Sequence, residues 1–302
     1  MNCINQTNGK NFSLFHGDCV EVISGLPNQS VDYSIFSPPF ASLYTYSNSP
    51  RDMGNVRNDE EFFDHFDFLV AQLARVMKPG HNVSFHCMLM PTSKERDGYI
   101  GLKDFRGDLI RAFQKHGFIY ASEVCIWKDP VTSMQRTKAL GLLHKTVRTN
   151  ACMSRQGIPD YLVTMRAPGE MVDKVTHTPE TYPVDKWQKV ASPVWMDINP
   201  NDTLQFRSAR EHDDERHICP LQLEVIRRGI DLWTNPGDVV LSPFTGIGSE
   251  GFVALEMGRK FVGAELKDSY FKQASANLLM AEKEQAQGLF APDEPEELRE
   301  PA

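Results

Sequence analysis

The sequence predicts an α/β protein whose mostly parallel sheet is covered by helices on both faces. The first observation is an alternation of short apolar runs with segments of helical periodicity, which is typical of such sheets. The second is a β-α-β unit near residue 240, where a short apolar strand leads into a glycine-rich turn, a helix and a strand that ends in an acid. A chain of 302 residues has room for one large domain with an insertion or for two domains.

The composition is that of a soluble globular protein, with 41% hydrophobic and 24% charged residues. The N-terminal residues MNCINQTNGKNFSLF lack the features of a signal peptide, and no apolar run approaches the roughly 20 residues that cross a bilayer. The six cysteines form no C-x-x-C pair, and there is no H-E-x-x-H. We therefore expect a cytoplasmic protein with reduced thiols, no membrane association and no metal site.

Charge is unevenly distributed along the chain, although the formal net charge is only −8. Residues 94–166 contain 13 Lys and Arg against 7 Asp and Glu, so this segment is basic. Residues 282–302 contain 2 Lys and Arg against 7 Asp and Glu, and we expect them to form a flexible acidic tail. The basic segment can face phosphates, although an ordinary solvated face has the same pattern.

The first half of the chain alternates between strands and helices. We expect strands at Asn11–Phe15, Val31–Phe36, Asn82–Leu89 and Phe118–Trp127, and helices at Val20–Leu26, Phe62–Met77 and Phe105–His116. Lys78-Pro79-Gly80 is expected to be a turn that ends the second helix. The polar residues 41–60 form a long loop, which we interpret as a candidate lid. Asp18 follows the first strand, where an acid either faces a ligand crevice or caps the next helix.

The tetrapeptide Ser37-Pro38-Pro39-Phe40 directly follows the second predicted strand. Two consecutive prolines have a fixed φ and no N–H donors, so the loop is stiff and its carbonyls are free to accept hydrogen bonds. With a hydroxyl before the prolines and an aromatic ring after them, such a loop can hold a planar base and its exocyclic amine. A plain Pro-Pro turn over a core phenylalanine is the alternative, because a four-residue motif is a weak signal.

The alternation of strands and helices is lost between Lys128 and about Arg216, where proline, threonine, serine and basic residues predominate. We interpret residues 128–216 as an insertion or a small domain that faces the substrate. Its basic side chains have few acids among them and are candidate contacts to nucleic-acid phosphates: Arg136, Lys138, Lys145, Arg148 and Arg155.

The C-terminal part contains the second functional signal. We expect helices at Leu221–Leu232 and Phe252–Met257 and strands at Val239–Leu241 and Phe261–Ala264. The glycine-rich turn is Ser242–Gly251. Gly246, Gly248 and Gly251 satisfy G-x-G-x-x-G, and Glu265 lies 19 residues after the first of them. Such glycines allow a tight turn and close approach to a ligand, and such an acid accepts hydrogen bonds from ribose hydroxyls.

Two cofactor classes fit this β-α-β unit, and a glycine-rich turn without a ligand is the third interpretation. A dinucleotide dehydrogenase would hold a pyrophosphate at the helix N-terminus. An S-adenosylmethionine enzyme has no phosphate to bind and often carries an aromatic residue before the first glycine, as Phe244 does here. A dehydrogenase also usually has this unit near the start of its cofactor domain, whereas here another candidate loop lies far earlier in the chain.

Together, these motifs resemble the beta class of DNA amino-methyltransferases, which methylate the N4 amine of cytosine or the N6 amine of adenine. The resemblance rests on the order of Ser37-Pro38-Pro39-Phe40, a variable region, His217-Ile218-Cys219-Pro220-Leu221 and Pro243-Phe244-x-Gly246-x-Gly248. It implies a Rossmann-like S-adenosylmethionine-dependent methyltransferase sheet with a permuted motif order. The implied parts are a catalytic half (1–127), a target-recognition region (128–216), a cofactor-binding half (217–281) and the acidic tail (282–302).

The resemblance also implies a role for each motif residue. The implied catalytic residues, which hold a base flipped out of double-stranded DNA, are Ser37, Pro38, Pro39 and Phe40. The implied S-adenosylmethionine pocket consists of Asp18, Cys19, Pro220, Phe244, Thr245, Gly246, Gly248 and Glu265. The family's cofactor turn commonly begins Asp-Pro-Phe, whereas this chain has Ser242 in place of the acid, so cofactor binding is weaker or another acid takes this role. A homodimer is compatible with the family.

The chemistry of amine methylation accounts for the tetrapeptide. An aromatic amine is a poor nucleophile because its lone pair is delocalised into the ring. Acceptors at the Ser37 hydroxyl and the Pro38 carbonyl would direct this lone pair at the sulfonium methyl and stabilise the positive charge that develops on nitrogen. Phe40 would stack on the flipped base. Ser rather than Asp before the prolines resembles the cytosine-N4 enzymes, since a hydroxyl can also donate to cytosine N3, and this favours cytosine N4 over adenine N6.

Several other functions remain open on the sequence. The absence of any Pro-Cys dipeptide argues against a cytosine-C5 enzyme, which needs a cysteine nucleophile. The G-x-G-x-x-G pattern alone would also suit a nicotinamide-dependent oxidoreductase. The missing acid at Ser242 is compatible with a catalytically silent DNA-binding protein. An RNA or protein substrate for the same chemistry is a further alternative, as is a DNA-modification role with or without a partner nuclease.

Overall fold

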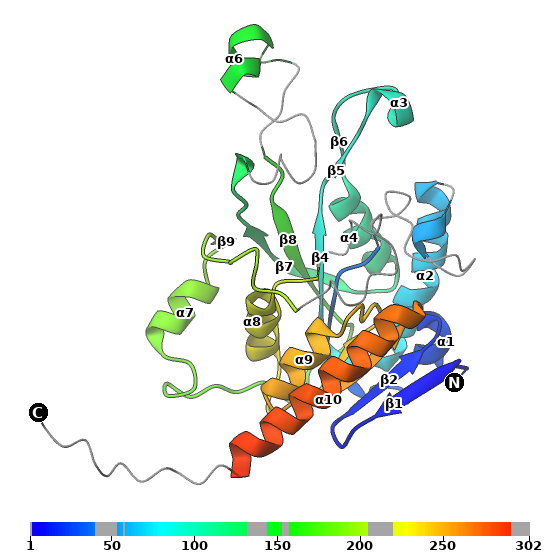
Figure 1. The fold of residues 1–302 in the computed structure, drawn as a ribbon, viewed down its shortest axis with the longest axis vertical. Coiled ribbons are helices and arrows are strands. Elements are labelled where there is room, and N and C mark those ends of the chain that lie inside the picture. Colours follow the sequence, from blue (N-terminus) through cyan, green and yellow to red (C-terminus); the bar gives the residue numbers. More distant parts are fainter. Residues whose placement is uncertain are drawn as a thin grey trace, which may run out of the picture.

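The central sheet has the strand order β1-β2-β11-β10-β3-β4-β8-β7-β9 (Figure 1). The computed structural model describes residues 2–39, 53–56, 58–131, 144–150, 152, 157–204 and 220–290. The strands of this sheet are β1 (Asn5–Asn8), β2 (Phe12–His16), β3 (Val31–Phe36), β4 (Met77–Met88), β7 (Ile119–Ile126), β8 (Asp160–Arg166), β9 (Val194–Trp195), β10 (Val239–Ser242) and β11 (Lys260–Glu265). Strands β2, β11, β10, β3 and β4 run parallel, whereas β8 is antiparallel to its neighbours β4 and β7.

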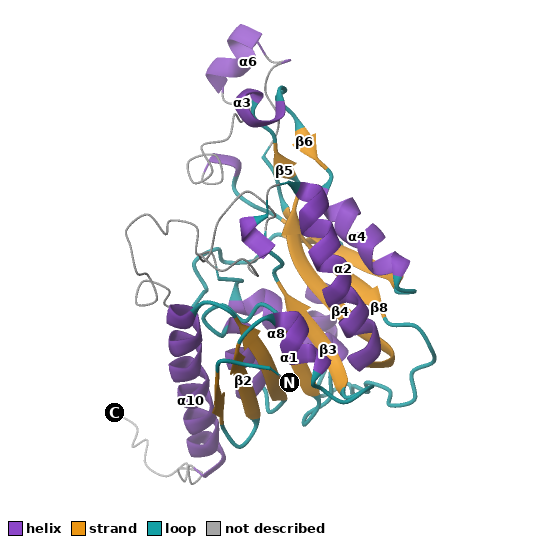
Figure 2. Cartoon of the chain, turned by 90° about the vertical axis from the view of Figure 1, so that its right-hand side faces the viewer, coloured by secondary structure: helices purple, strands orange, loops and turns teal. Residues whose placement is uncertain are grey.

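Helices cover both faces of this sheet (Figure 2). One layer contains α1 (Cys19–Ser24), α2 (Asp59–Val76) and α4 (Phe105–Lys115), and the other contains α8 (Leu223–Trp233), α9 (Ser249–Glu256) and α10 (Asp268–Phe290). Each layer encloses its own hydrophobic core against the sheet. The predicted α/β fold with a mostly parallel, doubly covered sheet is therefore confirmed.

Strand β3 shows why the middle of the sheet reads as a continuous apolar run. All six of its residues are buried. Val31 and Phe36 pack into the core under α2, whereas Tyr33 and Ile35 pack into the core under α8. The buried Asp32 is compensated, because its Oδ2 accepts the Val239 N–H at 2.8 Å and its Oδ1 lies 2.6 Å from Lys78 Nζ. Because β3 is covered on both faces, even its polar residues are buried, and Ser34, like Asp32, has a hydrogen-bond partner within the fold.

The connection from α2 to β4 differs from the expected turn. Helix α2 ends at Val76, where the pattern predicted, but β4 begins at Met77 without an intervening loop. The Lys-Pro-Gly sequence instead lies inside β4, where the register against β3 shifts between the first and second paired residues. Gly80 has a φ of +75°, a left-handed conformation that accommodates this irregularity.

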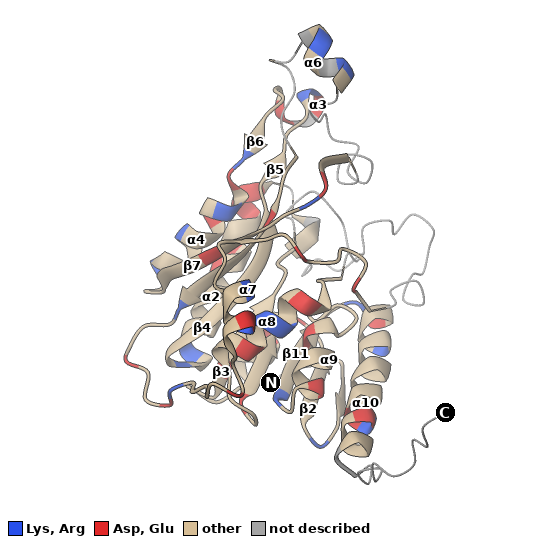
Figure 3. Ribbon diagram, turned by 90° about the vertical axis from the view of Figure 1, so that its left-hand side faces the viewer, with Lys and Arg blue, Asp and Glu red and all other residues tan. Residues whose placement is uncertain are grey.

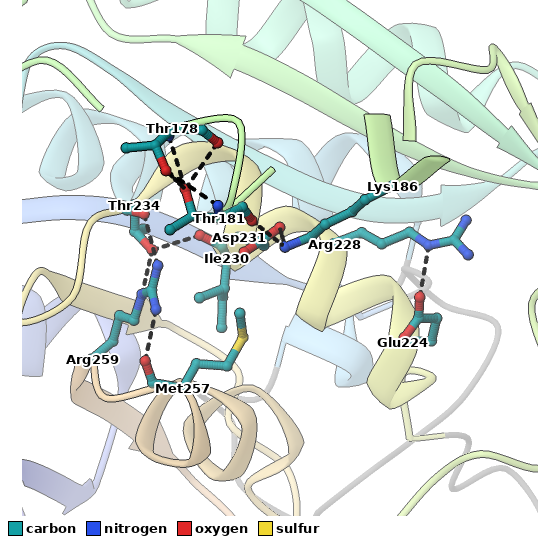
Figure 4. A network of polar contacts seen from close by, with 10 residues as sticks. All are labelled: Thr178, Thr181, Lys186, Glu224, Arg228, Ile230, Asp231, Thr234, Met257 and Arg259. Atoms are coloured by element: carbon teal, nitrogen blue, oxygen red, sulfur yellow. Dashed lines mark hydrogen bonds and ion pairs between the residues drawn. The ribbon is translucent and has the colours of Figure 1, made fainter. Parts of the chain in front are cut away.

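Residues 128–216 contribute strands to the main sheet, which the sequence analysis did not predict. Strand β8 lies between β4 and β7, and β9 pairs with the outer side of β7. Helix α7 (Val184–Val190) is tied to α8, since Lys186 Nζ lies 2.7 Å from Asp231 Oδ2 (Figure 4). Part of residues 128–216 therefore belongs to the main sheet, and the interpretation of this region as target-recognising stays a prediction. Residues 167–183 separate β8 from α7, so this part of the chain lacks the closely repeated β-α pattern from which the other strands were predicted.

The expected acidic tail begins later than predicted. Helix α10 continues to Phe290, and its Glu282 accepts the backbone N–H groups of Lys10 at 3.1 Å and Asn11 at 2.6 Å. The sequence contains no proline between the start of α10 and residue 292, so nothing ends the helix at residue 281. Residues 291–302 lie outside the described residues.

The predicted lid, residues 41–60, lies mostly outside the described residues. Its described part includes a one-turn helix, Met53–Asn55, and Met53 and Val56 are buried in the core with α2. This end of the loop is therefore fixed to the scaffold. Among the described residues, no helix combines the length and apolar character that a membrane span needs.

Candidate active site at the switch point of the sheet

The Ser37 tetrapeptide and the glycine turn lie next to each other between β3 and β10, where successive strands begin to be added in the opposite direction along the sheet. From β10 the chain returns through α9 to β11 on one side, whereas from β3 it returns through α2 to β4 on the other. Open α/β sheets bind ligands outside the carboxyl ends of the strands at such a switch point. Ser37 follows β3 and Phe244 follows β10, and the rings of Phe36 and Phe244 lie 5.8 Å apart. The tetrapeptide and the glycine turn, far apart in sequence, are thus neighbours in space.

The glycine turn is held by its own backbone and by the neighbouring strand. Thr245 donates its backbone N–H to the Ala264 carbonyl at 3.0 Å, and Gly248 donates to the Thr245 carbonyl at 2.8 Å. Gly246 and Gly248 have φ values of +55° and +94°, which favour glycine at both positions. A Cβ atom at Gly246 would meet no atom within 4 Å. The turn therefore presents a glycine backbone to open space, as a close ligand approach requires.

Glu265 lies beside this turn at the carboxyl end of β11. Its Oε2 accepts the Gly246 N–H at 2.7 Å, and its Oε1 accepts the Lys267 N–H at 2.8 Å. These bonds fix the carboxylate at the edge where the turn is open. The predicted association of Glu265 with the glycine turn thus appears as a direct contact.

Asp18 and Cys19 follow β2, next to β11. Gly17 donates its N–H to the Glu265 carbonyl at 2.9 Å, so this loop adjoins the glycine turn. Asp18 caps α1, because its Oδ1 accepts the Glu21 N–H at 3.0 Å. Cys19 is buried in the core, and burial together with the nearby Asp18 carboxylate raises the pKa of its thiol well above the usual value. The Cys19 thiol is therefore neutral, and the implied place of Asp18 and Cys19 in the cofactor pocket stays a prediction.

Pro220 is half-buried and precedes α8, which packs against β3 and α9. Its proposed place in the wall of the cofactor pocket stays a prediction. His217 and Cys219, which belong to the same motif, lie outside the described residues.

An acid that the sequence analysis passed over lies in the first turn of α9. Glu250 is only 4% exposed, and burial raises the pKa of its carboxyl from 4.5 to about 8, with a further contribution from Glu265. Ser242, which stands where the family usually has an acid, is fully buried, and its Oγ has no hydrogen-bond partner within the described part of the chain. A second carboxyl is therefore present at the turn, although it comes from the helix instead of the strand.

The Ser37 hydroxyl leads into a buried polar chain that the sequence analysis also missed. Ser37 Oγ lies 3.2 Å from His86 Nδ1, and His86 Nε2 lies 3.0 Å from Asp160 Oδ2. Asp160 also forms an ion pair with Lys128. His86 is one of several polar residues in β4, so no signal in the sequence singled it out. Pro38 and Pro39 continue from Ser37, whereas Phe40 lies outside the described residues.

The candidate DNA-binding residues are only partly within the described structure. Lys145 and Arg148 are exposed on α6 (His144–Asn150), which projects beyond the main sheet (Figures 1 and 3). Arg136, Lys138 and Arg155 lie outside the described residues. The hairpin formed by β5 (Met90–Pro91) and β6 (Leu102–Lys103), with α3 (Lys94–Asp97) at its tip, extends β4 in the same direction as α6 (Figure 1).

The residues around the glycine turn suit a cationic cofactor better than an anionic one. Two carboxyl groups, those of Glu250 and Glu265, lie at the turn, and the first turn of α9 has no basic residue. A pyrophosphate at this helix N-terminus would lie near the Glu265 carboxylate, whereas a sulfonium ion would be stabilised by that carboxylate. Within the described residues, no group of three or more His, Cys, Asp and Glu side chains is arranged to hold a metal ion.

Comparison with known proteins agrees with this site. The DNA methylase family of N6 and N4 methyltransferases matches residues 31–276. The type II methyltransferase M.BglII of Bacillus subtilis is 26% identical over 262 residues, which are 85% of this chain and 66% of M.BglII. The DNA adenine methyltransferase YhdJ of Escherichia coli is 25% identical over 288 residues, or 92% of this chain and 86% of YhdJ. The chain thus spans just under two thirds of M.BglII.

Solved structures share the fold over nearly the whole chain. TTHA0409 of Thermus thermophilus, a putative DNA modification methylase in complex with S-adenosyl-L-methionine, has a TM-score of 0.65 at 22% identity and covers 90% of this chain and 96% of its own. The cytosine-N4-specific PvuII DNA methyltransferase has a TM-score of 0.65 at 16% identity and covers 95% and 96%. The sheet is therefore the Rossmann-like sheet of these methyltransferases. With the family match over most of its length, the chain belongs to the DNA methylase family of N6 and N4 amino-methyltransferases.

Proposed function

We propose that this protein transfers a methyl group from S-adenosylmethionine to the exocyclic amine of a base flipped out of double-stranded DNA, with cytosine N4 as the preferred target. The observation that supports this most is the meeting of the Ser37-Pro38-Pro39 loop with the glycine turn at the switch point of the sheet. One motif suits an amine and the other a nucleoside with a cationic sulfonium. A homodimer stays a prediction from the family.

The proposed mechanism assigns a separate task to each side of the site. When bound, S-adenosylmethionine supplies an electrophilic methyl group. Glu265 would accept hydrogen bonds from the ribose, and the open backbone at Gly246 would allow the cofactor to approach. Ser37 and the Pro38 carbonyl would accept the two amine hydrogens, so that the nitrogen lone pair is directed at the methyl group. These acceptors would also stabilise the positive charge that develops on nitrogen.

The choice between cytosine and adenine is supported by less evidence. The resemblance of the Ser37 tetrapeptide to that of cytosine-N4 enzymes favours cytosine, and the PvuII enzyme that shares the fold is cytosine-N4-specific. YhdJ, a relative of similar identity, is an adenine methyltransferase. Adenine N6 is therefore the alternative target within the same proposal.

The test is incubation of the purified protein with unmethylated duplex DNA and S-adenosylmethionine that carries a labelled methyl group. We expect the label in the DNA, and nucleoside mass spectrometry to show N4-methylcytosine. N6-methyladenine would move the target to the alternative base. No transfer to DNA of diverse sequence, together with no measurable S-adenosylmethionine binding, would contradict the proposed function. Titration with NADH tests the oxidoreductase alternative from the sequence analysis, which requires that NADH binds.

Replacing Glu265 with glutamine is expected to raise the Kd for S-adenosylmethionine by roughly tenfold or more. A hydrogen bond to a charged group contributes about 1.5–3 kcal/mol, and the variant loses the carboxylate that holds Gly246 and would hold the ribose. Isothermal titration measures the Kd. Glu282→Gln is the matched control, because Glu282 also accepts two backbone N–H groups but lies on α10 beside the β1–β2 turn. Equal affinities for the two variants would remove Glu265 from the cofactor site.

A further inference from the structure

Behind Ser37 lies a chain of polar groups drawn from three strands of the sheet. Ser37 follows β3, His86 belongs to β4, and Asp160 begins β8. Lys128, just beyond β7, pairs with the same carboxylate as His86. The side chain of Asp160 is 4% exposed and that of His86 is 12% exposed. Buried polar groups are costly unless they are paired, so this chain needs a defined arrangement of its protons.

The arrangement of protons follows from Asp160 outward. Burial by itself would raise the pKa of Asp160, but the nearby His86 and Lys128 outweigh this effect and lower the pKa below its usual value. Asp160 is therefore an ionised acceptor. The His86 Nε2 atom lies 3.0 Å from this carboxylate without the alignment of a hydrogen bond, and an ionised acceptor at this distance favours a proton on Nε2.

A neutral imidazole with its proton on Nε2 has an unprotonated Nδ1, which can only accept. The partner of Nδ1 is Ser37 Oγ at 3.2 Å, so with the single imidazole proton on Nε2 it is Ser37 that donates its hydroxyl proton to His86. We propose that the Asp160–His86 pair positions Ser37. His86 accepts the hydrogen bond from the Ser37 hydroxyl, so the Ser37 oxygen can only accept from the substrate amine. This inference rests on the proposed methyl transfer to an exocyclic amine.

The proposal has a consequence for specificity. If Ser37 only accepts, it does not donate to cytosine N3, in contrast to the donating role expected from the sequence. Ser37 and the Pro38 carbonyl then form a pair of acceptors that binds an NH₂ group and repels a carbonyl oxygen. This pair distinguishes cytosine from thymine and adenine from hypoxanthine, but it treats cytosine and adenine alike. The preference between these two bases then comes from other walls of the pocket.

The protonation of His86 is tested without any assay of activity. Two-bond nitrogen–proton correlation NMR on the ¹⁵N-labelled protein near neutral pH identifies the tautomer of each histidine, and His86→Asn assigns the signal. We expect a neutral Nε2–H imidazole in the wild type. In Asp160→Asn the amide can donate to Nε2, so the proton should move to Nδ1, as happens when the aspartate of a catalytic triad is replaced by asparagine. A wild-type His86 with a protonated Nδ1 would overturn the proposal.

The consequence for methyl transfer is tested by single-turnover kinetics with the full-length protein. Asp160→Asn is expected to lower the rate on the order of 100-fold, with an S-adenosylmethionine Kd within about twofold of the wild type. His86→Asn keeps an acceptor near the Nδ1 position and should retain far more activity than His86→Leu. Asp67→Asn is the matched control, since Asp67 Oδ1 lies 3.0 Å from His116 Nε2 in a similar pair away from the site.

The results separate this proposal from the proposed function. A wild-type protein that neither methylates DNA nor binds S-adenosylmethionine contradicts the function, while the tautomer of His86 still decides whether the pair orients Ser37. A wild type that methylates DNA and an Asp160→Asn variant with an unchanged rate overturn the positioning role alone. Equal losses in His86→Asn and His86→Leu, with both variants still binding S-adenosylmethionine, would also overturn it, because an acceptor would not have rescued the rate.

Discussion

Ser37→Ala is expected to lower the rate of methyl transfer by roughly 10²–10³-fold without changing the Kd for S-adenosylmethionine. The variant removes an acceptor that faces the charge developing on the amine, and the loss of one such preorganised group has an effect of this size. The glycine turn and Glu265 are untouched, so the cofactor should bind as before. Single-turnover transfer of labelled methyl to duplex DNA gives the rate, and isothermal titration gives the Kd.

Ser34→Ala is the matched control for this prediction. Ser34 lies three residues earlier on β3, and its buried hydroxyl donates to the Leu241 carbonyl at 3.0 Å. Its loss should reduce the free energy of unfolding by about 1 kcal/mol and leave the rate of transfer nearly unchanged. If Ser37→Ala lost rate and cofactor binding together, the tetrapeptide would be a structural turn and not a base-holding loop. Phe40→Ala is expected to lose rate in the same way.

The parts of the fold that could be predicted from the sequence are those with a local signature. Strand β3 is a continuous apolar run, and α2 has a periodic stripe that includes Phe62, Phe66 and Leu73, all of which are buried. The glycine turn was recognisable because two of its residues, Gly246 and Gly248, have positive φ values that other residues rarely adopt. In each case the information lies within about 30 residues of sequence, the length of one β-α-β unit.

The parts that could not be predicted depend on contacts between distant segments. The place of β8 in the sheet depends on its pairing with β4 and β7. Both pairings are antiparallel, which the repeated β-α pattern does not predict. His86 pairs with Leu162 and Asp160 with Met88, so the two side chains meet diagonally across the β4–β8 ladder. Both strands contain other polar residues, and the partner of each cannot be identified without the register. The same holds for Glu282, whose bonds to Lys10 and Asn11 close α10 onto the start of β2.

Glu250→Gln is expected to raise the free energy of unfolding at pH 8 by a few kcal/mol. The pKa of Glu250 is about 8 in the folded protein because the carboxyl is buried, against 4.5 for an ordinary glutamate. Below pH 4.5 the carboxyl is protonated in both states, so burial has no ionic penalty. Between pH 4.5 and about 8 the unfolded chain loses the proton and the folded protein keeps it, so the wild type loses stability by up to about 1.4 kcal/mol per pH unit. Glutamine does not titrate and escapes this loss.

Urea unfolding of the cofactor-free protein at several pH values between 4.5 and 9 measures this difference. The gap between Glu250→Gln and the wild type should widen up to about pH 8 and then level off, whereas Glu256→Gln, an exposed acid at the end of the same helix, should show no such trend. A gap independent of pH would mean that Glu250 is ionised in the fold. If Glu250 takes the role of the acid missing at Ser242, a bound cationic cofactor must lower its pKa. Saturating S-adenosylmethionine should then stabilise the wild type more than Glu250→Gln at pH 7, and a dinucleotide should not.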